Sequence, residues 1–420
     1  MKIGIIGGGI SGLSLAILLK DSFEVEILEK EAKPGGIARA KVIKTSDGEV
    51  AYHTNGGHCF NSKYSDVLEF VFNILNKDSW HYIKRECKVL YKGRQIGYPI
   101  EFALREINTI NSKLALKMAT ELLNASYKNG KNLEEWFINH FGETLAKEYF
   151  IPYNTKIWGI EPKNMDNSWI ADDKQIKLPV PTKEGIFQAM LEGSAKDLMP
   201  HVFYYYPQAN NGLLNALEET CKNELILNYK VEKLEKIGEK WLINGEKKYD
   251  LLINTSPLDV LGVEILNVPD NVKEAFLKLK FNKVSTAFCK SNEPLNFTWG
   301  YVPDSNIRFH RLNCVSSYFG FKNLPFCTIE SIGEVSEEIF KKEVKKVANL
   351  EVLECETSKH AYVLFDLNYK DSKQKALKYV ESLGIIPHGR FGEWEYYNMD
   401  VCIKRSIDLA KALKAKFKGV

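Results

Sequence analysis

The first thirty residues hold a glycine-rich turn between two apolar runs. Residues 2–6 (Lys-Ile-Gly-Ile-Ile) have the composition of a short strand, and residues 7–12 (Gly-Gly-Gly-Ile-Ser-Gly) follow at once. Residues 13–20 have the pattern of a helix, and residues 25–29 read as a second strand that ends in Glu29. A strand, a glycine turn, a helix and a second strand in this order predict a dinucleotide-binding βαβ unit.

The glycines and the acid have separate physical roles in this motif. Gly7 allows a tight turn, Gly9 lets the backbone approach a pyrophosphate, and Gly12 lets helix and strand pack closely. The start of the helix presents free N–H groups and the positive end of its dipole to the phosphates. Glu29 lies where a carboxylate can bind both hydroxyls of an adenosine ribose. We therefore expect an adenosine dinucleotide; a glycine turn in a nucleotide-free α/β domain is the alternative.

The residues after Glu29 favour FAD over NAD. Residues 29–39 continue into the turn Pro34-Gly35-Gly36 and then Arg39. Two glycines permit close backbone approach, and a guanidinium matches phosphate oxygens in a fork, although a surface turn with a solvated arginine has the same residues. The segment resembles the extended FAD signature of the amine oxidase and protoporphyrinogen oxidase-like superfamily. In that superfamily the Gly-Gly turn and the arginine lie along the flavin diphosphate.

Composition narrows the class of protein. A chain of 420 residues is too long for one simple core, and its 45% apolar and 26% charged residues are typical of a soluble protein. The net charge of +3 gives no strong field for nucleic acid. The weakly polar stretch 3–19 is interrupted by glycines, so we expect neither a signal sequence nor a membrane span there. The basic C-terminal tail is read as a solvated helix end, with peripheral membrane contact as the alternative.

Eight cysteines are scattered without a Cys-x-x-Cys pair and without a His/Cys cluster at metal-ligand spacing. This pattern predicts buried free thiols in a reducing cytoplasm and no metal site. We therefore expect a cytoplasmic protein that acts on a small-molecule substrate and does not bind nucleic acid. The oligomeric state stays open.

The chain as a whole predicts an α/β fold. We expect a discontinuous Rossmann-like FAD-binding domain (1–62, 205–262 and 375–420), a mainly helical insert (63–204) and a β-rich substrate domain (263–374). Predicted helices cover 65–75, 112–127, 133–140, 213–222 and 401–416, and a predicted strand covers 225–234. Asn244-Gly245 predicts a hairpin within 240–249, and Lys92-Gly93 predicts a second turn.

Four further blocks resemble one branch of these flavoproteins. Residues 56–60, 92–100, 133–162 and 389–400 are similar to the UDP-galactopyranose mutase and protoporphyrinogen oxidase-like branch, whereas residues 265–370 match it poorly. The resemblance places His58 at the isoalloxazine ring, where an imidazole could tune the flavin. It places Tyr153 and Trp158 at the uridine and diphosphate end of the substrate. Because Pro152 and Asn154 are close by, this segment need not be regular helix.

The resemblance also assigns cofactor contacts in the second half of the chain. Val231 resembles a strand position whose backbone pairs with adenine, and Arg390 an arginine that reaches the flavin diphosphate or ribityl chain. Asn398 and Met399 should open a helix whose amides reach the flavin pyrimidine. The expected FAD-binding residues are Gly7, Gly9, Ser11, Gly12, Glu29, Lys30, Gly36, Arg39, His58, Val231, Gly389, Arg390, Asn398 and Met399. The expected substrate-binding residues are Tyr153, Trp158, Arg311 and Tyr396, with His58 in a catalytic role.

Two positions depart from the mutase pattern. The mutases place an arginine on the substrate diphosphate fourteen residues after the tryptophan, where this chain has Asp172, and an anion there would repel the diphosphate. The mutases also have Tyr-x-Asp where this chain has Tyr396-Tyr397-Asn398. The lost charge could come from another cation, and the candidates are Lys174, Lys177, Arg308 and Arg311.

The resemblance implies an FAD enzyme that acts on a nucleotide- or lipid-linked sugar in envelope polysaccharide synthesis. An oxidoreductase is the leading reading, with hydride transfer from a substrate C–H to the flavin N5 atom. The alternative is a mutase-type isomerase in which the reduced flavin attacks the anomeric carbon without net redox change. An FAD-binding protein without catalysis is the third class.

Overall fold

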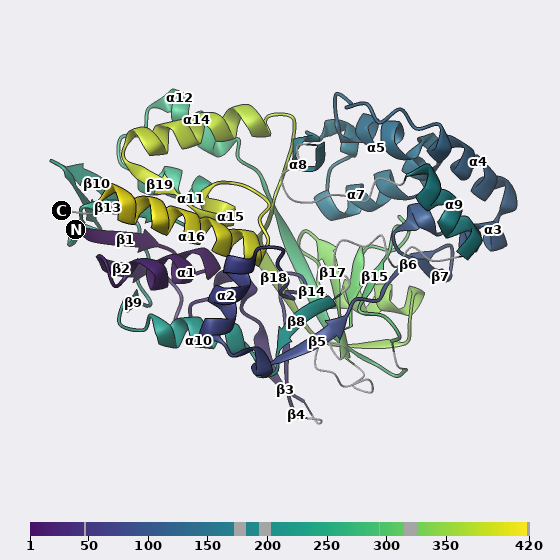
Figure 1. Cartoon of the computed structure of the whole chain (residues 1–420), viewed down its shortest axis with the longest axis horizontal. Helices are drawn as coiled ribbons and strands as arrows, with labels where there is room; N and C mark the ends of the chain where they lie inside the picture. The colour runs from purple at the N-terminus through teal and green to yellow at the C-terminus, as the bar shows by residue number, and fades with distance from the viewer. Residues whose placement is uncertain (46–47, 172–181, 193–202, 294, 315–325, 418–420) are drawn as a thin grey trace.

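The computed structural model describes the chain except for residues 46–47, 172–181, 193–202, 294, 315–325 and 418–420. Figure 1 shows three regions: a lobe that holds both chain termini, a group of helices, and a large sheet. The long strands β14 (Phe281–Ser291) and β18 (Leu350–Val363) pair with each other near the place where the three regions meet (Figure 1). The expected α/β class is confirmed.

The lobe with the termini is built on a parallel five-stranded sheet in the order β19-β13-β1-β2-β9. Its strands come from three parts of the chain: β1 (Lys2–Ile6), β2 (Glu24–Leu28), β9 (Leu225–Ile226), β13 (Leu251–Asn254) and β19 (Ile385–Pro387). Ile3 and Ile5 of the central strand β1 are fully buried, as expected for a parallel sheet that is covered on both faces. Helices α1 (Ile10–Leu19) and α16 (Met399–Lys416) lie side by side on one face (Figure 1).

The segment after β9 departs from the predicted strand 225–234. Pairing ends at Ile226, because Asn228 adopts a left-handed φ of 54° and the chain turns away. The Asn228 and Tyr229 amides then donate to Glu31 and Glu29 carbonyls. A three-stranded antiparallel sheet follows, made of β10 (Leu234–Ile237), β11 (Lys240–Ile243) and β12 (Lys247–Tyr249). The predicted hairpin at Asn244-Gly245, with φ values of 51° and 78°, is confirmed.

In the helical region, two helices have asparagine N-caps and one helix ends at a left-handed glycine. Asn111 and Asn132 cap their helices, each side chain accepting a hydrogen bond from the backbone N–H three residues on. Gly159, with a φ of 69°, ends α7. The helices are α3 (Leu104–Ile110), α4 (Ser112–Leu123), α5 (Leu133–Phe141), α6 (Glu143–Leu145), α7 (Ile151–Trp158), α8 (Ser168–Ala171) and α9 (Lys183–Glu192). The segment Tyr153–Trp158, for which the sequence left regular helix open, is helical, and Pro152 lies in the first turn of α7, where proline is tolerated.

The large sheet has seven strands in the order β18-β14-β17-β16-β15-β6-β7. Its other strands are β6 (Cys87–Tyr91), β7 (Arg94–Gly97), β15 (Trp299–Tyr301), β16 (Arg311–Asn313) and β17 (Phe326–Ile332). Strands β6 and β7 belong to the range 63–204, and β6 pairs in parallel with β15. Lys92 and Gly93, both with positive φ, form the predicted turn between β6 and β7. The sheet therefore joins two distant parts of the chain.

Smaller elements connect these regions. Two antiparallel pairs are formed by β3 with β4 and by β5 with β8. The remaining elements are β3 (Lys41–Thr45), β4 (Gly48–Tyr52), β5 (Trp80–Lys84), β8 (Phe203–Pro207), α2 (Ser65–Ile74), α10 (Gly212–Thr220), α11 (Leu258–Glu264), α12 (Asp270–Leu277), α13 (Glu337–Glu343), α14 (Tyr369–Ser382) and α15 (Gly389–Gly392). All eight cysteines are free, and five of them are buried. None of the helices in the described ranges is both long and apolar enough to cross a membrane.

Candidate functional site

The glycine turn at the end of β1 is open on one side only. Gly7 has a φ of 101°, and a Cβ on Gly12 would overlap the Gly7 carbonyl oxygen. Gly9 has extended backbone angles (φ −76°, ψ −176°), and no described heavy atom lies within 4 Å of the position that its Cβ would take. The turn is thus tight at Gly7 and Gly12 and leaves free space at Gly9.

Helix α1 begins beside this space. Its N-cap residue is Gly9, which provides no side-chain cap for the N–H groups of the first turn. Ser11, in that turn, lies against Gly389, where a Cβ would overlap the Ser11 hydroxyl. Free N–H groups at a helix start next to open space form an anion site.

Glu29 holds its carboxylate at the same turn. The residue is buried, Oε2 accepts a hydrogen bond from the Gly8 N–H at 2.7 Å, and Oε1 accepts one from the Glu31 N–H at 2.9 Å. The carboxylate therefore lies where the dinucleotide motif requires an acceptor for ribose hydroxyls. Lys30, by contrast, is exposed and lies 3.5 Å from the Glu31 carboxylate.

The second glycine turn packs on the first. The Gly35 N–H donates to the Gly8 carbonyl at 2.7 Å, and a Cβ on Gly36 would lie 3.3 Å from the Gly9 Cα. Arg39 follows, but its guanidinium donates to Asn215 and Glu218 of α10, each at 3.0 Å. Arg39 therefore ties this turn to α10. Gly36 thus lies next to the open space at Gly9, and the Arg39 guanidinium pairs with the Glu218 carboxylate.

A narrow cavity continues from the second glycine turn. It is mostly apolar, and its wall includes His58 and the first residue of α16, Met399. Asn398, the N-cap of α16, makes no side-chain cap hydrogen bond, and the first turn of this helix begins at the cavity wall with Met399. The lining residues are Ala38, Ala40, His53, His58, Phe60, Trp80, Tyr206, Pro207, Ala209, Asn211, Leu213, Leu214 and Met399.

His58 is a neutral imidazole in this wall. Its Nδ1 lies 2.8 Å from the Gly56 carbonyl oxygen, which can only accept, so Nδ1 carries the proton and Nε2 is a free acceptor. Burial lowers the pKa of His58 to about 4, and the charges of Arg390 and Arg311 add to this effect. At neutral pH the ring therefore accepts through Nε2 and carries no charge.

Arg390 lies over the aromatic residues next to His58. Its Nη2 donates to the Ala361 carbonyl at 2.9 Å, and its guanidinium carbon lies 4.5 Å from the centre of the Tyr396 ring. Its Nε is buried and has no partner among the described residues. A buried donor without a partner is uncommon in native structures and points to a missing acceptor.

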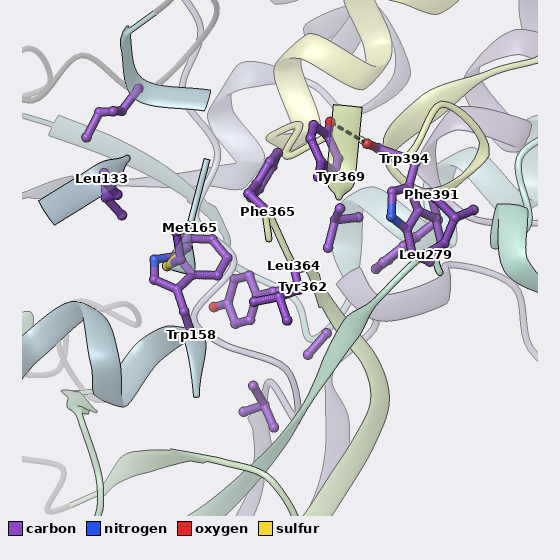
Figure 2. Packing of buried hydrophobic residues seen from close by; sticks show 14 of the residues in the cluster. Leu133, Trp158, Met165, Leu279, Tyr362, Leu364, Phe365, Tyr369, Phe391 and Trp394 are labelled. Carbon is purple, nitrogen blue, oxygen red and sulfur yellow. Dashed lines mark hydrogen bonds between the residues drawn. The ribbon is translucent and has the colours of Figure 1, made fainter. Parts of the chain in front are cut away.

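Trp158, Tyr362 and Tyr396 form an aromatic wall around this arginine. The Tyr362 and Tyr396 rings are stacked at 5.8 Å, and Trp158 meets both edge-on at 6.0 and 6.2 Å. Figure 2 shows Trp158 next to Tyr362 within the packed core. The Trp158 Nε1 donates to Asn154 at 3.2 Å, and the side chain is only 3% exposed. Most of the Trp158 ring is thus covered by protein.

Arg311 completes the group from the large sheet. Its Nη2 lies 2.5 Å from the fully buried Glu330 carboxylate and donates to the Tyr362 hydroxyl at 3.1 Å. A Cβ on Gly56 would lie 3.0 Å from the same Nη2, so Arg311 contacts the turn that carries His58. Burial alone would lower the pKa of Arg311, but Glu330 raises it well above its usual value. The guanidinium is therefore charged.

Tyr153 joins the group through Tyr301. The two rings meet edge-on at 5.6 Å, and Tyr301 lies directly opposite Arg311 in the pairing of β15 with β16. The structure thus brings together all the substrate-site residues expected from the sequence, next to His58 and Arg390. Sequence reasoning missed Tyr362, Tyr301 and Glu330.

Val231 lies outside a strand, because β9 has already ended. Its side chain is buried, and the Glu232 and Lys233 amides that follow it donate to Asn244 Oδ1. The expected strand position for adenine pairing therefore lies in an irregular segment between β9 and β10.

The residues around the two glycine turns fit an adenosine dinucleotide. The open side of Gly9 meets the free amides of α1, Glu29 presents its carboxylate at the same turn, and the cavity leads on to His58. The site is therefore built for a dinucleotide.

The comparisons with known proteins agree with this fold. Residues 5–74 match the family model of the NAD(P)-binding Rossmann-like domain. A dTDP-fucopyranose mutase of Escherichia coli is 28% identical over 177 residues, which are 40% of this chain and 44% of the relative. The chain thus matches less than half the length of this curated relative.

Solved structures match along nearly the whole chain. A reduced UDP-galactopyranose mutase superposes with a TM-score of 0.84 at 21% identity, covering 99% of this chain and 94% of that one. A putrescine oxidase double mutant superposes with a TM-score of 0.61 at 13% identity, covering 99% of both chains. The expected resemblance to mutase-like and amine oxidase-like flavoproteins is confirmed at the level of fold.

Proposed function

We propose that this chain is an FAD-dependent enzyme that interconverts the ring forms of a nucleotide-linked sugar. The observation that carries the proposal is that the aromatic wall and Arg311 lie directly against the His58 turn. A substrate held by Tyr396 and Arg311 would therefore be next to a cofactor held by the glycine turns. The match to mutase structures supports this reading.

The chain's own residues would hold the cofactor in three places. The α1 amides and Gly9 would bind the diphosphate, and Glu29 would accept the adenosine ribose hydroxyls. The start of α16 would lie at the pyrimidine carbonyls of the ring, and backbone N–H groups there would donate to them. When bound, FAD supplies an N5 atom that can act as a nucleophile or accept a hydride.

The pocket residues would orient the substrate and exclude water. His58 would accept a hydrogen bond through Nε2, because its proton is on Nδ1. Arg390 would donate through the Nε that lacks a partner. Tyr396 would lie against the sugar with Tyr362 and Trp158 packed behind it, and a buried, dry site strengthens each of these polar contacts.

The test is an anaerobic assay of FAD-loaded protein with UDP-galactopyranose and with dTDP-fucopyranose. The proposal expects furanose product from one of these substrates in the dithionite-reduced protein, and none in the oxidised protein. Flavin reduction by a substrate under the same conditions would instead identify an oxidoreductase. Protein that is loaded with FAD and changes neither substrate nor flavin would sink the proposed activity.

A further inference from the structure

One arginine near the pocket lies among aromatic rings instead of carboxylates. Arg85, directly after β5, is half-buried, and its guanidinium carbon lies 5.5 Å from the Tyr98 ring centre and 5.7 Å from that of Tyr204. Its Nε donates to the Cys87 sulfur at 3.0 Å, and its Nη2 donates to the Tyr301 hydroxyl at 3.3 Å. Within the described part of the chain, no carboxylate lies within ion-pair distance of Arg85.

In the described structure the charge of Arg85 has no carboxylate partner, and some of its N–H groups have no hydrogen-bond acceptor. A guanidinium has five N–H bonds, and the described partners of Arg85 are one thiol and one hydroxyl, both neutral. Tyrosine faces attract a cation but accept few hydrogen bonds from it. Arg311 and Arg39 differ from Arg85 in this respect. Arg311 pairs with the Glu330 carboxylate, and Arg39 pairs with the Glu218 carboxylate. Arg85 is therefore prepared for an anion that the described part of the protein does not provide.

Tyr301 connects Arg85 to the substrate pocket. Its hydroxyl contacts Arg85, its ring meets Tyr153 edge-on, and its backbone lies opposite Arg311. On the other side, Cys59 packs in the same small cluster as Cys87, Tyr204 and Tyr301. Because Cys59 follows His58 in the chain, this cluster adjoins the turn at the proposed flavin ring. Arg85 thus lies one tyrosine ring away from Tyr153.

We propose that Arg85 with Tyr98, Tyr204 and Tyr301, the Arg85 cage, binds an oxyanion of the substrate. The inference rests on the proposed function, since a nucleotide-linked sugar offers two such groups. One is the diphosphate, and the other is a carboxylate carried by the sugar itself. A guanidinium fork fits either group, because both present paired oxygens.

The test is calorimetric titration of FAD-loaded protein with UDP, UDP-galactose and UDP-galacturonic acid. Arg85→Gln removes the charge, and Arg85→Lys keeps the charge but loses the fork. The matched control is Arg94→Gln, because Arg94 is exposed at the β6–β7 turn and donates only to Thr109 within the described structure. Circular dichroism of each variant checks the fold.

The pattern of losses identifies the oxyanion. If the cage holds the diphosphate, Arg85→Gln lowers the affinity for all three ligands by about tenfold or more. If the cage holds a sugar carboxylate, Arg85→Gln lowers only the affinity for UDP-galacturonic acid by that factor. Either result supports the cage, and Arg94→Gln should match the wild type. Should Arg85→Gln fail to fold, Arg85→Lys is expected to give the same pattern with a smaller, several-fold loss.

Two results would overturn the inference, and they differ in what they reject. Unchanged affinities in a folded Arg85 variant would reject the cage alone and leave a purely structural role for Arg85. Wild-type protein that carries FAD but binds none of the three ligands would reject the proposed nucleotide-sugar function, and the cage with it.

Discussion

Gly9 and Gly12 lie three residues apart in one turn but have opposite surroundings. A side chain at Gly12 would overlap the Gly7 carbonyl, whereas a side chain at Gly9 would enter open space with backbone angles that any residue adopts. The protein itself therefore requires glycine at position 12. At position 9 the fold leaves room for a side chain, and the proposed dinucleotide would occupy that room.

We predict that Gly9→Val keeps the fold and loses FAD. The folded protein should lose at most about 1 kcal/mol from the poorer N-cap, while FAD binding should weaken by at least about tenfold, or ~1.4 kcal/mol, because the side chain fills the pyrophosphate space. Bound FAD is measured by absorbance after gel filtration, with Gly9→Ala as a milder step. A folded Gly9→Val protein that retains FAD like the wild type would contradict the assignment of this turn.

The Arg311–Glu330 pair is expected to behave as a unit. Removing one partner leaves a buried charge, so Arg311→Met or Glu330→Gln alone should cost about 3–5 kcal/mol of unfolding free energy. The double variant should cost clearly less than the sum, because it leaves no unpaired charge. Urea unfolding of the four proteins measures this coupling. Costs that add to within about 0.5 kcal/mol would show that the two side chains do not interact.

Sequence alone offered one of these two partners. Arg311 was a candidate because the site needs a cation, whereas Glu330 was missed although it is the only ionisable carboxylate in the strand Phe326–Ile332. A single acid in an otherwise apolar or small-residue strand is a usable sign of a buried ion pair. Its partner could not be identified, because that requires the register of β16 with β17.

At the scale of elements, α16 is held to the nucleotide sheet by a buried histidine. His388 follows β19, its Nε2 lies 2.8 Å from the Ser406 hydroxyl of α16, and its backbone N–H donates to Asn254 of β13. Burial, together with the charge of Arg405, lowers the pKa of His388 to about 3. The contact between these elements therefore depends on a neutral imidazole.

This histidine should make the fold sensitive to acid. Because its pKa is lower in the folded state, the unfolded chain binds the extra proton below about pH 6.5, so stability is present above that pH and is lost as the pH falls. Between pH 7 and 4.5 the loss from this group should be about 2.5 kcal/mol. His388→Gln should remove that part of the pH dependence in urea unfolding. Parallel pH profiles for the variant and the wild type would contradict the account.

The ends of helices and strands could be predicted where local sequence signals agree. The predictions failed where tertiary contacts decide the path of the chain. The start of α16 at Met399 and the turn at Asn244-Gly245 follow from local sequence. The predicted strand 225–234 failed, because the chain at Asn228 follows the loop after Glu29 instead of the sheet edge. No local pattern in that segment announces the change.

At the scale of the whole molecule, the dinucleotide site is assembled from distant segments. The first glycine turn, the second glycine turn and the start of α16 all border it. Strands β1 and β2 of the parallel sheet were predictable, since they belong to the dinucleotide motif at the start of the chain. The seven-stranded sheet was not, because β6 joins β15 across a large separation in sequence.

A ligand that contacts all three segments should stabilise the molecule as a whole. Added FAD at about 100 times its Kd should raise the unfolding free energy by about 2.7 kcal/mol. The melting temperature of FAD-depleted protein should therefore rise with FAD concentration, and that of Gly9→Val should not. A wild-type melting temperature that does not respond to FAD would argue against a preformed cofactor site.

The central claim is that the dinucleotide site and the aromatic pocket open onto each other at His58. The most direct measurement is the visible absorption spectrum of the FAD-loaded protein during titration with UDP. The account predicts a saturable change in the flavin bands, because a ligand held by Tyr396 and Arg311 would alter the surroundings of the ring. Flavin bands that stay constant while calorimetry shows that UDP binds would place the two sites apart and contradict the claim.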